Sequence, residues 1–511
     1  MKQTLRSIYT IFALFLVINS GCEKEKFNVT SDERPEPTIV LSVDDASLQQ
    51  PAETELYFTV TFEAQAGIRN IRILQGATEV ESLDFTEGKV KYNYVIRELM
   101  DDRFEVGDKI DYQFSIEDNL GRTSMYSFQV EVTPPPPLDP TFTIVDRTIN
   151  GEVFKAISGT INLDVELEST SNYILSGNVT VRSGSTLHIQ PGTTIYGEAL
   201  STLVISIGAT INASGTKEEP IVFTSINDLN GNGKLADWVG LHINGLAPVS
   251  GTASSLANEI GNYGGSNPAD NSGKLQYVRV EFAGAALAGS SGALNFNGVG
   301  SGTTIDHINV HQADGHAIRF RGGSANLKYA FIDHADGRAL RWESSYIGFV
   351  QHILAIYTSN PSSAVTLIEG YDPTSNPTLS NITLMSLGSS AYSNSRAIRL
   401  RDGTKGRIYN TLITNTVTGV RADDLSAEIA SGSLFFGYSH LWNNSTRDYQ
   451  NDATAFSTSA FNNKTSAVPL NGYIGTAAGG YAPKQLNAWF DDTSYIGAVP
   501  ETDDWTANWT K

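Results

Sequence analysis

The sequence predicts an all-β protein whose larger part is a parallel β-helix. Two segments, Val310–Phe320 and Ile332–Trp342, repeat each other with Asp314 on Asp336, an offset of 336 − 314 = 22 residues. A period in the low twenties, built from short alternating strands, is typical of a solenoid whose coils bury their inward residues against their neighbours. The composition agrees, since 46 Gly and 18 Pro in 511 residues suit many short strands with turns.

The charge excludes one class of partner. The formal net charge is −20, from 35 Lys and Arg against 55 Asp and Glu. An acidic field repels phosphate, so we expect no nucleic-acid partner. The sequence also has no P-loop, dinucleotide fingerprint, zinc spacing or nucleophile elbow, and we expect no required cofactor.

The N-terminus predicts export and lipid anchoring. Residues 1–22 have a basic start and an apolar run, Ile8–Ile18, that is too short for a transmembrane helix. The lone cysteine, Cys22, follows this run and resembles a bacterial lipobox, although Asn19 stands where that motif prefers Leu. The resemblance implies that Cys22 carries a lipid that holds the protein on a membrane.

The tether 23–35 begins with alternating charges, Glu23–Lys26. It is similar to the tether that sends lipoproteins of the Bacteroidetes type to the outer face of the outer membrane. The resemblance implies a protein exposed at the cell surface. Retention at the periplasmic face is the alternative.

Residues 36–132 contain about seven short alternating runs, among them Glu55–Thr61 and Ile110–Ile116. Such spacing predicts an antiparallel β-sandwich. The segment Ile116–Ser124 resembles the last hairpin of immunoglobulin-like modules, which implies a spacer domain. The proline-rich linker 133–141 then separates it from the next domain.

The β-helix is expected over residues 142–424, with a C-terminal cap region over 425–511. One strand position recurs as apolar-polar-apolar triplets, which alternation turns so that the middle residue faces solvent. The middle residues form a column: Asn295, Arg319, Arg341, Thr366, Arg399 and Arg421. A second strand position has a column that resembles the corner ladder of right-handed β-helices: Tyr277, His307, Tyr329, His352, Asn381 and Asn410. We therefore interpret its histidines as corner residues rather than ligands.

Several motifs resemble a family of β-helical surface lipoproteins of Bacteroidetes, some of which carry a "multidrug transporter" label. They span most of residues 142–511 and include Leu187–Ile195, Gly208–Thr216, Pro220–Ser225, Asp237–Gly240, Tyr277–Phe282, Gly300–His307 and Tyr495–Ala498. The resemblance implies a right-handed parallel β-helix at the cell surface. It implies no activity.

The first candidate site is the arginine column, whose members are Arg319, Arg341, Arg399 and Arg421, with Arg321 and Arg401 two residues further on. Adjacent coils lie about 4.8 Å apart, so stacked arginines repel unless anions lie between them. Two interpretations stay open. One is a ladder of salt bridges, and the other is a groove for a glycan that bears carboxylate or sulfate groups.

Two further candidates involve carboxylates. Glu281, His311 and Asp333 fall in one outward column, where an acid and a base on neighbouring coils would suit a polysaccharide lyase or hydrolase. The loop with Asp228, Asn230, Asn232 and Asp237 fits part of a calcium loop, and two interpretations stay open, an Asn/Gly-rich turn and a structural Ca²⁺.

These features together predict a lipid-anchored protein of the outer membrane that binds a glycan or a partner protein through its β-helix without catalysis. The alternatives are a polysaccharide lyase or glycoside hydrolase, and a structural or adhesive stalk.

Overall fold

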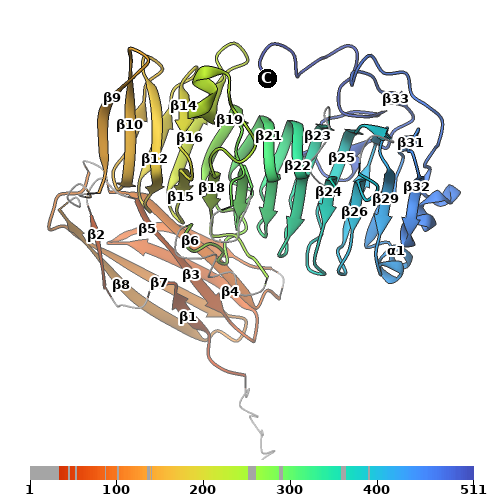
Figure 1. The fold of residues 1–511 in the computed structure, drawn as a ribbon. Helices are drawn as coiled ribbons and strands as arrows, with labels where there is room; N and C mark the ends of the chain where they lie inside the picture. Colours follow the sequence, from red (N-terminus) through yellow and green to blue (C-terminus); the bar gives the residue numbers. More distant parts are fainter. Residues whose placement is uncertain are drawn as a thin grey trace, which may run out of the picture. The chain divides into compact units, whose positions relative to one another are not determined.

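The computed structural model of the protein describes residues 34–43, 47–51, 55–86, 88–100, 103–134, 139, 141–250, 260–286, 292–357, 364–388 and 392–511. Cys22, most of the tether and most of the proline-rich linker lie outside these residues. The chain forms two compact units, of which the smaller holds most of the N-terminal strands and the larger holds the whole solenoid (Figure 1). Within the described ranges, no helix is long and apolar enough to cross a membrane.

The N-terminal strands form two sheets. The first has the order β1-β3-β6, with β1 (Thr38–Leu41), β3 (Glu55–Glu63) and β6 (Lys91–Leu99). The second has the order β2-β8-β7-β4-β5, with β2 (Ser47–Pro51), β8 (Thr123–Thr133), β7 (Lys109–Asp118), β4 (Ile68–Gln75) and β5 (Thr78–Asp84). The rings of Phe62 on β3 and Phe114 on β7 meet edge to face at 6.4 Å, so the sheets pack face to face. The predicted sandwich is present, and its immunoglobulin-like character stays a prediction.

The solenoid has three parallel sheets, and long strands contribute to more than one of them. The first sheet contains parts or all of β12 (Asn172–Val181), β15 (Thr202–Ile205), β18 (Gly240–Asn244), β20 (Leu294–Asn297), β21 (Thr304–Arg321), β22 (Asn326–Glu343), β24 (Thr366–Gly370), β26 (Arg396–Leu400), β29 (Thr418–Ala422) and β32 (Arg447–Asn451). In Figure 1 these strands follow one another along the solenoid in chain order.

The second and third sheets complete each coil. The second contains parts or all of β11 (Val165–Leu167), β13 (Thr186–Ile189), β16 (Thr210–Ser214), β19 (Gly273–Glu281), β21, β22, β23 (Phe349–Ile356), β25 (Thr378–Met385), β27 (Gly406–Tyr409) and β30 (Leu434–Gly437). The third runs through β10 (Glu152–Ile161), β12, β14 (Thr194–Gly197), β17 (Ile221–Ser225), β19, β21, β22, β23, β25, β28 (Thr411–Thr414) and β31 (His440–Trp442). At the start, β9 (Thr143–Ile149) pairs antiparallel with β10.

The core follows from the alternation of the strands. In the first sheet the inward positions stack in register, as Leu294, Ile318 and Leu340 do, and each is completely buried. The rings of Phe296 and Phe320 also stack at 5.2 Å on adjacent coils. Because the interior is filled this way along its length, the outward residues of each sheet are held at fixed spacing.

The predicted corner ladder is confirmed. Tyr277, His307, Tyr329 and His352 all have φ between 47° and 59°, a left-handed conformation that turns the chain between the second and third sheets. Their rings stack with centroid distances of 4.2, 4.5 and 4.5 Å in chain order. The ladder histidines are therefore used in packing between coils.

The coils extend beyond the boundary that we expected at residue 424. Strands β30, β31 and β32 continue the parallel pairing with β27, β28 and β29. The helix α1 (Ser426–Ser431) lengthens the turn before this coil, and its strands are short, which hides the period in the sequence. The later segment contains η3 (Asp452–Ser457), η4 (Ser459–Phe461), η5 (Pro483–Gln485) and the pair β33 (Ala477–Ala478) and β34 (Tyr495–Ile496).

The C-terminal segment after β32 runs back along the solenoid (Figure 1). Asn381 donates to the Tyr495 carbonyl at 2.9 Å, and Tyr329 donates to Asp491 at 3.0 Å. Further along, the Lys511 amide donates to Asn309 at 3.0 Å. This segment covers the corner ladder and the outer face of the third sheet rather than only the end of the last coil.

Candidate functional site

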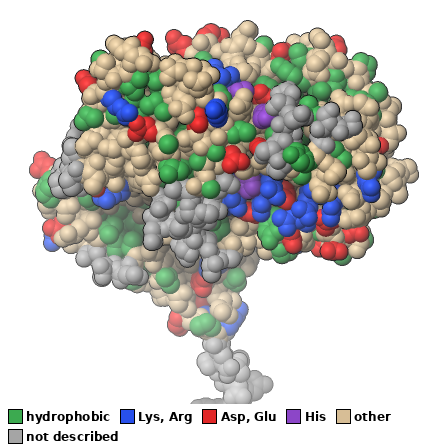
Figure 2. All heavy atoms as spheres, in the orientation of Figure 1, with side chains coloured by type: hydrophobic (Ala, Val, Ile, Leu, Met, Phe, Trp, Pro, Cys, Tyr) green, Lys and Arg blue, Asp and Glu red, His purple; other side chains and the backbone are tan. Residues whose placement is uncertain are grey.

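One outward face of the first sheet gathers most of the arginines of the solenoid. Coils present two residues at this face, as Arg319 and Arg321 do on β21. The apolar neighbours of Arg319, which are Ile318 and Phe320, point into the core. We call this the arginine face and define it by Arg319, Arg321, Arg341, Glu343, Glu369, Tyr371, Arg399, Arg401, Arg421 and Asp423, with Arg338 and Arg396 alongside. Figure 2 shows Lys and Arg side chains in a stripe across the solenoid.

The structure corrects one member of the predicted column. We expected Thr366 to follow Arg341, but the residue in register with Arg341 is Glu369. Glu369 is in turn paired with Arg399 on the next coil, while Thr366 lies between Arg338 and Arg396. A carboxylate therefore interrupts the arginine column near its middle.

Glu343 neutralises the first group of arginines. Its Oε1 accepts hydrogen bonds from Nε of Arg319 at 2.7 Å and Nε of Arg321 at 3.2 Å. Its Oε2 lies 2.6 Å from a guanidinium nitrogen of Arg341. Burial alone would raise the pKa of Glu343, but these three guanidinium groups outweigh it and hold the pKa below its usual value.

Glu369 is the centre of the second group, and its side chain is completely buried. Its Oε2 lies 2.9 Å from Arg338 and 3.1 Å from Arg341, and its Oε1 accepts from Nε of Arg401 at 3.1 Å. Burial would raise the pKa of Glu369, but Arg338 and Arg341 outweigh it and lower the pKa. One carboxylate on β24 thus links arginines of the two neighbouring coils, which contain β22 and β26.

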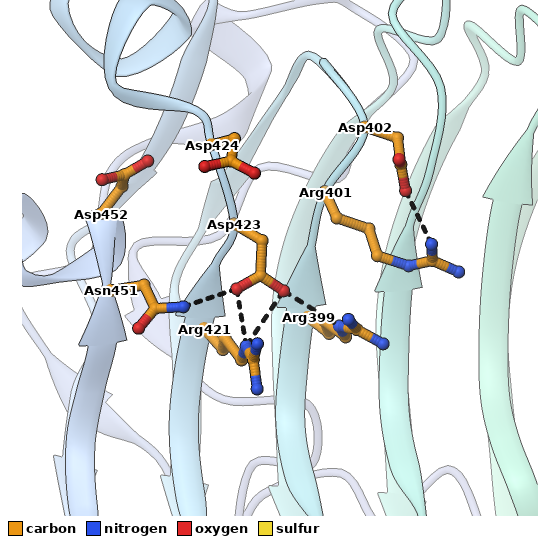
Figure 3. A pocket seen from close by; sticks show the side chains of 8 residues that line it. All are labelled: Arg399, Arg401, Asp402, Arg421, Asp423, Asp424, Asn451 and Asp452. Carbon is orange, nitrogen blue, oxygen red and sulfur yellow. Dashed lines mark hydrogen bonds and ion pairs between the residues drawn. The ribbon is translucent and has the colours of Figure 1, made fainter.

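A hollow of about 720 Å³ lies at the far end of the face (Figure 3). Arg421 donates from Nε to Asp423 at 2.7 Å, Arg399 donates to the same carboxylate at 3.2 Å, and Asn451 donates to it at 2.6 Å. The other residues that line the hollow are Arg401, Asp402, Asp424 and Asp452. Positively and negatively charged side chains therefore surround an open space on the surface.

The two interpretations of the column can now be compared. Among the described residues, the arginines of the face other than Arg396 are joined to carboxylates on their own or adjacent coils, so the salt-bridge ladder is present. Among the described residues of the face and the hollow, eight arginines stand with six carboxylates: Arg319, Arg321, Arg338, Arg341, Arg396, Arg399, Arg401 and Arg421 with Glu343, Glu369, Asp402, Asp423, Asp424 and Asp452. The carboxylates Asp314 and Asp336 at the neighbouring corner bring the two numbers level.

Two buried histidines border the other end of the face. Burial lowers the pKa of His242 to about 3, and the charge of Arg321 adds to this effect. Burial likewise lowers the pKa of His316 to about 2, with a further contribution from the charge of Arg319. Both rings are therefore neutral at physiological pH. Neither ring nitrogen of His242 has a hydrogen-bond partner.

A family model described as a pectate-lyase-like β-helix domain matches residues 159–510, which is most of the chain. The chain belongs to the pectate-lyase-like β-helix family. A comparison with curated proteins found no match.

In this pectate-lyase-like β-helix, the second predicted column is in register. Glu281 pairs with His311, and His311 pairs with Asp333 on the next coil. The ring Nδ1 of His311 lies 3.1 Å from an oxygen of Asp333. The carboxylate of Glu281, however, is only 1% exposed and lies 2.7 Å from the amine of Lys511.

The surroundings of this column close it further. Arg279 donates from Nε to Glu281 at 2.8 Å, and Thr224 donates to it at 3.0 Å. Next to the column, Phe331 and Leu354 are buried in a cluster with Trp505 and Trp509 of the C-terminal segment. A polymer has no access to Glu281 in this arrangement.

A pair of carboxylates that the sequence prediction did not name as a site lies at the corner beside the arginine face. Asp314 and Asp336 are in register on adjacent coils. Burial raises the pKa of Asp314, and the neighbouring Asp336 adds to this effect. Burial, then Asp336 and Asp314, also raises the pKa of Tyr357.

The oxygens of the predicted calcium loop are directed at protein groups. Asp228 lies 2.8 Å from the Lys511 amine, and Asp237 accepts from the Ser225 hydroxyl at 2.7 Å. Asn230 accepts from Asn150 at 3.4 Å. Across the described ranges, no group of three or more His, Cys, Asp or Glu side chains could hold a metal ion. A Ca²⁺ at Asp228, Asn230, Asn232 and Asp237 stays a prediction.

The sequence prediction missed Glu369, Arg338 and Arg396 at the arginine face, and His242 at its border. His242 is in register with Asn295, although 295 − 242 = 53 residues separate them. The triplet Leu241-His242-Ile243 has the same apolar-polar-apolar pattern as the later coils, so a search by pattern rather than by fixed period would have found it.

Proposed function

We propose that the protein binds an acidic polysaccharide along the arginine face. The observation that carries this proposal is the row of arginines from several coils on one outward face of a chain whose net charge is −20. A solenoid presents its outward residues at about 4.8 Å per coil, a regular spacing that suits a linear repeating ligand. The face would bind such a polymer through many weak contacts.

The chemistry of the face favours oxyanions. A guanidinium group donates two parallel hydrogen bonds to a carboxylate or a sulfate group, and so binds it in a defined orientation. The family description names pectate lyases, and pectate is a polymer of uronic acids with one carboxylate on each sugar. A polyuronate or a sulfated glycan would therefore match the groups on this face.

Binding without catalysis fits the surroundings of the acid column. The general acid of a hydrolase must reach the glycosidic oxygen, but Glu281 is buried against Arg279 and Lys511. The alternative is a lyase or hydrolase, either at Glu281, His311 and Asp333 or at the pair Asp314 and Asp336. A stalk and a partner-protein site are the remaining alternatives.

Lipid anchoring at the cell surface is the second part of the proposal. It rests on the apolar run Ile8–Ile18 and the lone Cys22. We expect labelling by radioactive palmitate in the wild type and none in Cys22→Ala, which should also move to the soluble fraction. Protease added to intact cells should degrade the wild type if it lies outside. Equal labelling of both proteins would refute the anchor.

The binding proposal is tested by affinity electrophoresis of residues 36–511 in gels that contain polygalacturonate, dextran sulfate or neutral dextran. The test variant is R399Q/R421Q/D423N, which removes two arginines together with the carboxylate they share and leaves no new unpaired charge at Asp423. The control is Arg407→Gln, which changes the net charge equally at an exposed site on β27.

We expect a charged polymer to slow the wild type and the control, and to slow the triple variant much less. Added salt should weaken the effect, since exposed charges are screened within about 10 Å at 0.1 M salt. Equal retardation of both variants would place the site elsewhere. Shortening of the polymer that depends on Glu281 or Asp336 would make the protein an enzyme, and no retardation at all would favour a protein partner or a stalk.

A further inference from the structure

Arg396 differs from the other arginines of the face. It lies on β26, and its neighbours in register are Thr366 and Thr418, which are neutral and buried. Its side chain is half-buried. Among the residues that the structure describes, no carboxylate forms a salt bridge with Arg396, whereas Arg338 and Arg401 both lie within 3.1 Å of Glu369.

The sequence supplies no counter-ion nearby in the chain either. The segments 358–363 and 389–391, which precede β24 and β26 and lie outside the described residues, contain no Asp or Glu. The segment 392–395 before Arg396 is also free of acids. The charge of Arg396 is therefore not matched by the strands beside it or by these connections.

The charges that act most strongly on the pKa of Arg396 have the same sign as its own. Burial lowers the pKa of Arg396 to about 10, and Arg421 and Arg399 add to this effect more strongly than Asp423 and Glu369 oppose it. Arg401 shows the opposite result, since Glu369 and Asp402 outweigh its burial and raise its pKa. A half-buried cation among like charges costs free energy unless an anion from outside the chain joins it.

We propose that Arg396, Arg399 and Arg421 form a subsite for one oxyanion group, a carboxylate or a sulfate ester, of the acidic glycan. The inference rests on the proposed function and adds the group that fixes the position of the polymer. Arg399 and Arg421 lie in register on adjacent coils and share Asp423, and Arg399 also lies 3.8 Å from Glu369. These contacts do not use all five N–H donors of either guanidinium group. Arg396 has no such carboxylate among the described residues, so its charge is the one that a further anion would match.

This arrangement predicts a result that an ordinary structural arginine would not give. Removing the charge in Arg396→Gln should leave the stability of the free protein unchanged or raise it, because a repulsion is lost. The same change should weaken binding of the charged polymer at least tenfold, which is about 1.4 kcal/mol. Arg407→Gln, with the same change of net charge, should alter neither.

The experiment measures urea unfolding and polymer binding for the wild type, Arg396→Gln and Arg407→Gln. If binding of polygalacturonate falls in Arg396→Gln, the bound group is a carboxylate. If binding of dextran sulfate falls, the bound group is a sulfate ester. Unchanged binding in Arg396→Gln, together with lost binding in R399Q/R421Q/D423N, would overturn the subsite and keep the proposed function. A loss of stability in Arg396→Gln would also overturn it, since that would show a structural partner.

A second measurement keeps the subsite testable if neither polymer binds. Inorganic sulfate should raise the unfolding temperature of the wild type and of Arg407→Gln in a saturable way, and should do so less for Arg396→Gln. That result would support the subsite even though the polymer proposal had failed. Equal stabilisation of all three proteins, or none in the wild type, would overturn it.

Discussion

Glu369 should be the carboxylate on which the stability of the arginine face depends most. Its carboxylate is completely buried and lies between Arg338, Arg341 and Arg401, with Arg399 at 3.8 Å. In Glu369→Gln the side chain keeps its shape but loses its charge. The four guanidinium groups then face one another with no central anion.

The expected loss of unfolding free energy in Glu369→Gln can be placed within a range. Removal of one partner from a buried ion pair costs about 3–5 kcal/mol. The arginine side chains are 13–33% exposed, so water would partly solvate them in the variant. We therefore expect Glu369→Gln to lose about 3 kcal/mol, at the lower end of that range.

The assay is urea unfolding followed by far-UV circular dichroism, with the slope of the transition checked to be unchanged. Glu501→Gln, at an exposed turn, is the matched control and should stay within about 0.5 kcal/mol of the wild type. A loss below about 1 kcal/mol in Glu369→Gln would mean that the face is screened like a surface ion pair, and would refute the reasoning.

The pH dependence gives a second check. The folded pKa of Glu369 is lowered, so the stability it contributes is present above its unfolded pKa of about 4.3 and is lost as the pH falls through the folded value. The difference between the wild type and Glu369→Gln should therefore shrink in acid. A difference that stayed constant down to the acid transition would exclude the charge as its cause.

Three further changes test other parts of the structure. In Asp491→Asn the C-terminal segment should detach more readily at neutral pH. The hydrogen bond from His352 is the largest cause that lowers the pKa of Asp491, so the stability that this carboxylate contributes is present above its unfolded pKa of about 3.9 and is lost in more acid solution. Tryptophan fluorescence should therefore show the wild type and the variant converging in acid. Lys511→Met removes a cation that lies beside the buried Glu281 carboxylate and should lower the free energy of unfolding by about 1–3 kcal/mol. Urea unfolding and limited proteolysis would detect this loss, and an unchanged stability would mean that the contact between Lys511 and Glu281 is not made. In Gly370→Ala the new Cβ would lie 2.3 Å from Cζ2 of Trp342, and we expect a loss of about 1–3 kcal/mol in urea unfolding; no loss would show a looser core.

The sequence by itself predicted the parts of the fold that repeat without interruption. The offset that places Asp314 on Asp336 is the register of β21 and β22, because no insertion separates those coils. The corner ladder was also predictable, since rings and amides recur at the one position that turns the chain. The family match confirms the β-helix.

Register across an insertion was decided by the core. The triplets Val365–Leu367 and Ile368–Gly370 follow a connection of different length, so a fixed period cannot choose between them. The structure places Gly370 in register with Trp342, where a side chain would not fit beside the indole. This packing brings Glu369, and not Thr366, into the arginine column. The balance of charge on the face therefore depends on a contact inside the solenoid.

The accessibility of the acid column was decided by a contact distant in sequence. Alternation placed Glu281, His311 and Asp333 in one column, and the structure agrees. What closes that column is Lys511, which lies 511 − 281 = 230 residues further along the chain. Local pattern determines which residues share a face, because strand geometry is local. Only the path of the whole chain determines whether that face is open, because the segment that covers it has no fixed offset from the strands beneath.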